Sequence, residues 1–118
     1  GGHNEGCLKA LQAMSKKYLK DKKITLLVSF MKDKDYESAL SVIAPLSENT
    51  VFTRTDTLRG EAPEVLAKAA EAYCKNIFCC QSPAEAYERA LSLTEDDGVL
   101  IVTGSFYLVS EIRNMLSE

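Results

Sequence analysis

The fold of this 118-residue chain is decided by one stretch, Ile24-Thr25-Leu26-Leu27-Val28-Ser29-Phe30. The stretch is almost continuously apolar and lacks the polar alternation of a strand with one wet face. Such a run is typical of a parallel strand that is covered by helices on both faces. It therefore predicts an α/β fold.

Helices and strands alternate on both sides of this stretch. Apolar residues at helical spacing predict helices over about 4–19, 36–43, 63–73, 83–93 and beyond 105. Short apolar runs predict further buried strands at 50–53, 77–80 and 99–102, the last being the most apolar of all. Strict alternation with short loops predicts a three-layer, Rossmann-like fold with a mostly parallel sheet, in a single domain over 1–118.

Local signals fix where several elements begin and end. Asp35 is the expected N-cap of one helix, and Pro45 is expected to stop it. Ser82 and Pro83 suit the N-cap and first position of another helix, with Glu85 completing a capping box. Asp96-Asp97-Gly98 predicts a tight turn into the last strand.

Composition narrows the classes of function. Apolar residues make up 46% and charged residues 26%, with a net charge of −3, so no nucleic-acid surface is indicated. No apolar run approaches the ~20 residues of a membrane span, and no signal peptide is visible, so we expect a cytoplasmic protein without membrane contact. The cysteines fit no zinc spacing and are expected to be small buried thiols; they are Cys7, Cys74, Cys79 and Cys80.

Ligands of parallel α/β sheets bind beyond the carboxyl ends of the strands. The expected loops there are Gly1–Asn4, Met31–Asp35, Arg54–Ala62, Gln81 and Thr103–Ser105. Backbone amides of Gly1–Asn4 suit an anion pocket in which His3 faces a phosphate, although a plain turn with a surface histidine fits as well. Function is therefore sought at this edge.

The segment Thr103-Gly104-Ser105 follows the most apolar strand and opens a helix. The Ser105 hydroxyl and nearby amides suit a carboxylate, and the same residues also suit an ordinary N-capped turn; both roles are compatible. Lys34 lies between Asp33 and Asp35, where it either meets an anionic substrate or belongs to a solvated charge cluster. Arg54 and Arg59 allow the same two interpretations. A Walker-type phosphate loop is absent from the sequence.

Taken in order, these segments resemble the folylpolyglutamate synthase family, including its bifunctional dihydrofolate synthase form. The resemblance is carried by Gly1-Gly2-His3-Asn4-Glu5-Gly6, by Leu27–Asp35 with its Asp-Lys-Asp ending, by Val51–Arg54 followed by Leu58-Arg59, and by Val102–Val109. It extends over nearly the whole chain. The family's Asp that contacts the nucleotide ribose would stand just before Gly1, and Glu5 replaces the commoner proline.

The resemblance implies a C-terminal, Mur-ligase-like domain of a larger ATP-dependent ligase. In that family ATP phosphorylates the terminal carboxylate of a folate, and the amino group of L-glutamate attacks the acyl phosphate. ATP and Mg²⁺ would be bound mainly by an N-terminal domain, the partner of this one. The domain alone is expected to be inactive, with no catalytic residue, cofactor or metal of its own.

The resemblance also implies roles for individual residues. His3 would lie near the ATP phosphates or the incoming glutamate, Ser105 and Tyr107 would help to bind glutamate, and Lys34 would contact an anionic group. Two other classes stay open at this point. They are the C-terminal domain of a Mur-type peptidoglycan ligase and a stand-alone Rossmann-like binding module.

Overall fold

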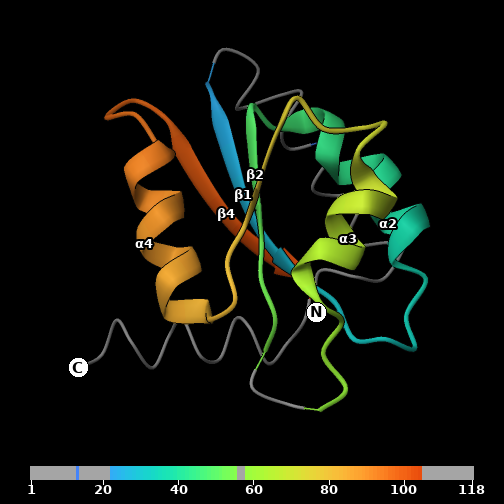
Figure 1. Cartoon of the computed structure of the whole chain (residues 1–118). Coiled ribbons are helices and arrows are strands. Elements are labelled where there is room, and N and C mark those ends of the chain that lie inside the picture. The colour runs from blue at the N-terminus through green and yellow to red at the C-terminus, as the bar shows by residue number, and fades with distance from the viewer. Residues whose placement is uncertain (1–12, 14–21, 56–57, 105–118) are drawn as a thin grey trace.

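The computed structural model describes Ala13, residues 22–55 and residues 58–104, and strands alternate with helices through it (Figure 1). Its elements are β1 (Ile24–Ser29), α2 (Tyr36–Ile43), the short 3₁₀ helix η1 (Ala44–Leu46), β2 (Asn49–Phe52), α3 (Pro63–Ala70), β3 (Asn76–Cys79), α4 (Pro83–Leu93) and β4 (Val99–Gly104). The predicted alternation is confirmed over 24–104. Ala13 is helical, and the rest of the two predicted terminal helices falls outside the described residues.

The four strands form one parallel sheet in the order β3-β2-β1-β4. β1 pairs with β4 along its whole length, from Ile24↔Val99 to Ser29↔Gly104. On its other side β1 pairs with β2 from Thr25↔Asn49 to Val28↔Phe52. Every residue of β1 is buried, as the opening stretch predicts for a strand between two neighbours and two helical layers.

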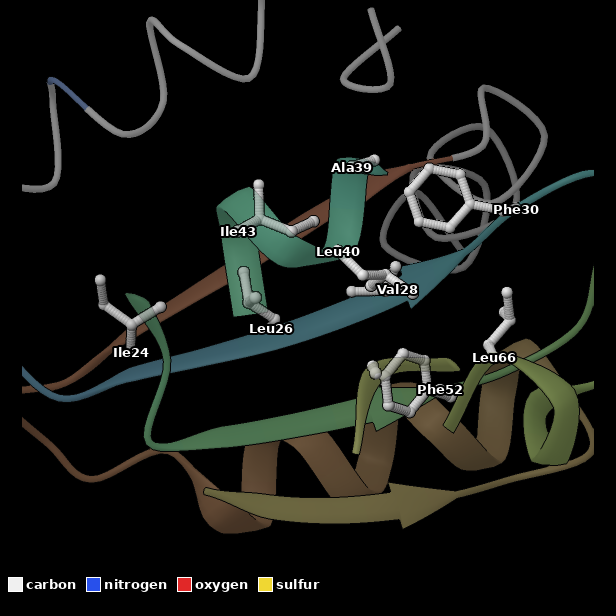
Figure 2. Packing of buried hydrophobic residues seen from close by; sticks show 10 residues of the cluster. Ile24, Leu26, Val28, Phe30, Ala39, Leu40, Ile43, Phe52 and Leu66 are labelled. Carbon is white, nitrogen blue, oxygen red and sulfur yellow. The ribbon is translucent and has the colours of Figure 1, made fainter. Parts of the chain in front are cut away.

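Alternate side chains of β1 enter two separate hydrophobic clusters. Ile24, Leu26 and Val28 face α2 and α3, where they pack with Leu40, Ile43, Phe52 and Leu66 (Figure 2). Leu27 faces α4 instead and packs with Val51, Ala86 and Ala90. Full burial of one such large apolar side chain contributes about 1.5–3 kcal/mol. The three-layer arrangement is confirmed, with α2 and α3 on one face and α4 on the other (Figure 1).

The structure confirms the predicted N-caps Asp35 and Ser82, the end of a helix before Pro45 and the turn before β4. Asp35 Oδ1 accepts the Ser38 N–H at 3.3 Å, and Ser82 Oγ accepts the Glu85 N–H at 3.2 Å, so each side chain satisfies an amide that its helix leaves unpaired. α2 ends at Ile43, and Pro45 falls in the tighter η1 that follows. The Gly98 N–H donates to the Glu95 carbonyl at 2.8 Å, which closes the turn into β4.

Two predictions about burial are wrong. β3 was expected to be a buried strand over 77–80, but it spans Asn76–Cys79 at one edge of the sheet, with its ends exposed. β4 has the most apolar sequence, yet its residues 99–102 are only half-buried, and β1 is the most buried strand. Apolar composition predicts that a strand forms, whereas its place in the sheet decides how far it is covered.

The cysteines follow the same logic. Of the three described cysteines, Cys80 is buried, Cys74 is half-buried and Cys79 is exposed, so the expectation of buried thiols is correct only for Cys80. Cys80 extends the pairing of β3 with β2, because its N–H donates to the Phe52 carbonyl at 2.9 Å. Burial raises the pKa of all three thiols, so they stay protonated at neutral pH. They are consequently weak nucleophiles and weak metal ligands.

Candidate ligand site at the carboxyl edge of the sheet

The order of the strands defines one position where a ligand would bind. From β1 the chain proceeds to β2 and β3 through α2 and α3, and then α4 returns across the opposite face to place β4 on the other side of β1. The direction of winding therefore reverses between β1 and β4, whose carboxyl ends pair as Ser29↔Gly104. Ligands of open parallel sheets bind outside the strand ends at such a reversal.

The loop that follows β1 contains Lys34, the described residue to which the family resemblance assigns a role in the site. This loop, residues 30–35, starts with buried Phe30 and Met31 and then exposes all four charged residues of Lys32–Asp35. The Lys34 N–H donates to the Met31 carbonyl at 3.2 Å, and the Lys34 carbonyl accepts the Tyr36 N–H at 2.9 Å. The backbone of Lys34 is thus held on both sides while its ammonium group faces solvent at the predicted edge.

The loop that follows β2 lies directly against the loop that follows β1, at the lower end of the sheet in Figure 1. Met31 and Gly60 form an antiparallel bridge. The Lys32 N–H donates to the Arg59 carbonyl at 2.8 Å, and the Glu61 N–H donates to the Phe30 carbonyl at 2.8 Å. The two loops therefore form a short ladder of backbone hydrogen bonds, which sequence patterns did not indicate.

Charged groups of the two loops also meet. Arg59 Nη2 lies 3.5 Å from Asp33 Oδ2, with the two side chains 70% and 60% exposed. An exposed ion pair of this kind adds about 0–1 kcal/mol to the free energy of unfolding. Its main effect is therefore on how the two loops are oriented, and its effect on stability is small. The sequence allows the same two interpretations for Arg54 and Arg59 as for Lys34, namely contact with an anionic substrate or membership of a solvated charge cluster. The structure brings Arg59 beside the loop that carries Lys34. Arg54 is exposed just after β2, and its side chain lies next to Gly60.

Glu61 connects three elements at this edge. Its Oε2 accepts the hydroxyl hydrogen of Tyr36 at 3.2 Å, and its Oε1 accepts the Ala62 N–H at 3.1 Å, next to the first residue of α3. Burial, followed by the hydrogen bond and the negative charge of Glu61, raises the pKa of the Tyr36 phenol above its ordinary value. Sequence analysis singled out neither residue for the site, because a lone loop glutamate and a helical tyrosine carry no pattern.

Two buried hydroxyl groups end the central strands at the same edge. Ser29 Oγ and Thr53 Oγ1 are completely buried, and neither makes a hydrogen bond to the part of the chain that the structure describes. The Thr53 N–H continues the ladder by donating to the Val28 carbonyl at 3.0 Å, so the two residues are neighbours across β1 and β2. Strand alternation places both hydroxyls on the face covered by α4. Each is a polar residue at the end of an apolar run, and this is the sequence signal that could have found them.

The other predicted site residues cannot be compared with this geometry. His3, Ser105 and Tyr107 fall outside the described residues. Thr103 and Gly104, predicted as part of a turn, still belong to β4, and Thr103 is buried. Within residues 22–55 and 58–104 no three His, Cys, Asp or Glu side chains are grouped to hold a metal ion. Among the described helices none has the length and apolar character to cross a membrane.

Comparisons with known proteins give a consistent result. A family model described as "Mur ligase, glutamate ligase domain" matches residues 1–106. The chain is 25% identical over 116 residues to a dihydrofolate synthase/folylpolyglutamate synthase of Bacillus subtilis (strain 168). The matched region covers 98% of this chain and 26% of that protein. It therefore spans about a quarter of the length of this curated relative.

Solved structures resemble the fold over almost its full extent. A Mycobacterium tuberculosis folylpolyglutamate synthase complexed with ADP superimposes with a TM-score of 0.88 at 21% identity, covering 98% of this chain and 28% of that one. A bifunctional folylpolyglutamate synthase/dihydrofolate synthase from Yersinia pestis, complexed with AMPPNP and a Mn ion, gives 0.85 at 20% identity, with 98% and 27% covered. At these identities the likeness demonstrates the fold.

Proposed function

Because this chain belongs to the family of Mur ligase glutamate ligase domains, we propose that it is the C-terminal, glutamate-binding domain of a folylpolyglutamate synthase. The observation that carries the proposal is the match to the Bacillus subtilis enzyme, which extends over 98% of this chain. The family alone includes ligases of other substrates, and the curated relative directs the proposal to folate.

The proposed reaction belongs to the complete enzyme. The terminal phosphoryl group of ATP is transferred to the terminal carboxylate of a folate or folylpolyglutamate, which gives ADP and an acyl phosphate. The amino nitrogen of L-glutamate then attacks the acyl carbon, inorganic phosphate leaves, and an amide bond forms. The task of this domain is to hold the incoming glutamate, an amino acid with two carboxylates, in the orientation that brings its amine to the acyl carbon.

Positive charge at the carboxyl edge suits that task. Lys34 is exposed there in the loop after β1, and its ammonium group is a suitable partner for a glutamate carboxylate. We assign His3 to the phosphates or the glutamate, and Ser105 and Tyr107 to the glutamate, on the positions that they share with the family pattern. These three assignments are residue-by-residue extensions of the family resemblance.

ATP and Mg²⁺ are assigned mainly to the remainder of the enzyme. Relatives of known structure are complexed with ADP, or with AMPPNP and a Mn ion. Within residues 22–55 and 58–104 there is no cluster of metal-ligating side chains. The chain also lacks a Walker-type loop. We assign the binding of ATP and folate to an N-terminal domain, which would be the partner of this one, and we expect the enzyme to act in the cytoplasm.

Replacing Lys34 in the complete enzyme tests the assignment. Lys34→Ala should raise the KM for L-glutamate by about 10- to 100-fold, because it removes a hydrogen bond between charged groups, and should leave the KM for ATP unchanged. Lys22→Ala is the matched control, since Lys22 is exposed just before β1, at the opposite edge. An unchanged KM for L-glutamate would remove Lys34 from the site.

A substrate comparison tests the reaction itself. The complete enzyme should consume ATP and incorporate L-glutamate when supplied with a folate, and should do neither with UDP-muramyl substrates. The reverse outcome would reassign the domain to a peptidoglycan ligase of the same family. Absence of activity with both substrates would leave the family membership and refute the proposed reaction.

A further inference from the structure

We propose that Glu61 is a positioning residue for Lys34, because it fastens both ends of the loop that carries this lysine. The inference rests on the proposed function in taking Lys34 as a contact for glutamate. It adds a second loop, residues 58–61 after β2, to the parts of the molecule that determine how tightly glutamate is held. Glu61 itself does not touch the substrate in this proposal.

The two attachment points lie on either side of the loop. The Glu61 N–H donates to the carbonyl of Phe30, the residue with which the loop begins, at 2.8 Å. The Glu61 carboxylate accepts the hydroxyl hydrogen of Tyr36, the first residue after the loop, at 3.2 Å. One residue therefore spans the base of the loop, and Lys34 lies between the two points.

The surroundings of Glu61 keep it in place. Its second carboxylate oxygen accepts the Ala62 N–H at 3.1 Å, and α3 starts at the next residue with buried Pro63. The rings of Phe30 and Tyr36 lie 6.3 Å apart between centroids, which closes the base of the loop on its apolar side. Glu61 is thus anchored to a helix of the core, and a displacement of the Lys34 loop would have to break bonds to that anchor.

Such an anchor matters because a lysine is a flexible ligand. Its ammonium group sits on a four-carbon stem, so binding a carboxylate costs conformational freedom that a fixed backbone reduces. The backbone of Lys34 is already held within the loop by Met31 and Tyr36. Fixing the base of the loop as well leaves only the side chain to be ordered when glutamate binds. A looser base should therefore weaken glutamate binding without altering the chemical step.

The test is the substitution Tyr36→Phe in the complete enzyme. It removes the hydroxyl group that donates a hydrogen bond to Glu61, and it keeps the aromatic ring. We expect the KM for L-glutamate to rise about two- to tenfold, with kcat and the KM for ATP unchanged. Glu61→Gln retains an acceptor oxygen and the backbone N–H, so it should raise the KM less than Glu61→Ala does. Tyr87→Phe is the matched control, because Tyr87 lies on α4, against the opposite face of the sheet.

Combining the substitution with Lys34→Ala separates positioning from a general loss of stability. If Tyr36 and Glu61 act through Lys34, Tyr36→Phe should have no further effect on the KM for L-glutamate once Lys34 is alanine. Equal effects in both backgrounds, or no effect of Tyr36→Phe in the parent enzyme, would overturn the inference. A Lys34→Ala enzyme with an unchanged KM would instead refute the assignment of Lys34 on which the inference depends.

Discussion

Gly60 is a residue at which the loop after β2 folds back on itself and leaves no room for a side chain. A Cβ atom at this position would lie 2.8 Å from Thr55 Oγ1 and 3.3 Å from the Thr55 backbone nitrogen. Contacts this short force either the side chain or the backbone to move. Gly60 also forms the antiparallel bridge with Met31, so any displacement would be passed to the loop that carries Lys34.

Gly60→Ala should therefore lower the free energy of unfolding by about 1–3 kcal/mol, the usual cost of an added methyl group in a tightly packed place. Urea unfolding of the variant and the parent measures the difference. Thr55→Ala removes the nearest atom, so adding it to Gly60→Ala should cost less than the sum of the two single substitutions. Unaltered stability of Gly60→Ala would contradict the predicted crowding.

The Tyr36 phenol gives a prediction about pH. Its pKa is raised in the folded chain by burial, by the hydrogen bond to Glu61 and by the charges of Glu61 and Glu37. An unfolded tyrosine loses its proton near pH 10, whereas folded Tyr36 retains it there, so stability should fall as pH rises above about 10. Below about pH 9 both states are protonated, and the residue adds no pH dependence.

The measurement is urea unfolding between pH 8 and 11, compared among three proteins. Tyr36→Phe should show a shallower decline at the alkaline end than the parent chain. Tyr87→Phe is the control for loss of another half-buried tyrosine, and it should retain the steep decline. Equal declines in all three proteins would show that Tyr36 titrates normally.

Secondary-structure elements were predictable where their determinants are close in sequence. Ser82, Pro83 and Glu85 lie within one helical turn, and the start of α4 agrees with the prediction. The burial of β3 and β4 was not predictable, because it depends on which strands become neighbours. The Tyr36–Glu61 hydrogen bond joins residues 25 positions apart, and no periodic pattern reports such a contact. The edge that carries the candidate site followed from the fold class, but its second loop did not.

The start of α4 offers a test at the scale of one element. Ser82→Ala removes the oxygen that accepts the Glu85 N–H, and it should lower the free energy of unfolding by about 1 kcal/mol. Thermal unfolding provides the measurement. Ser92→Ala is the control, because Ser92 Oγ donates only to a carbonyl of its own helix, that of Arg89, at an exposed position. If Ser82→Ala lowers the free energy of unfolding no more than Ser92→Ala does, the N-cap does not stabilise the domain.

The whole molecule is a small part of the relatives that it matches, at 26% of the length of the curated one. Within residues 22–55 and 58–104 it presents cationic side chains at the carboxyl edge, but no group of three potential metal ligands. The cationic side chains suit an anionic substrate, and the proposed function assigns phosphoryl transfer to the remainder of the enzyme.

We accordingly expect that the chain by itself neither hydrolyses ATP nor ligates glutamate to a folate. Phosphate release and amide formation should both be observed with the complete enzyme under the same conditions. The complete enzyme carrying Lys22→Ala serves as the active reference, because this exposed lysine is remote from the candidate site. ATP hydrolysis by the isolated chain would contradict the assignment of the nucleotide site to the rest of the enzyme.

The pairing of β1 with β4 has a consequence for how the domain is made. Among the four strands of the described sheet β1 is synthesised first, yet its partner on one side consists of residues 99–104. Until those residues emerge, one edge of β1, the most buried strand of the folded sheet, is unpaired and open to association with other polypeptides. Synthesis of β4 thus completes the described sheet. If synthesis slows or stops just before residue 99, we expect this domain to be most exposed to aggregation and most in need of a chaperone.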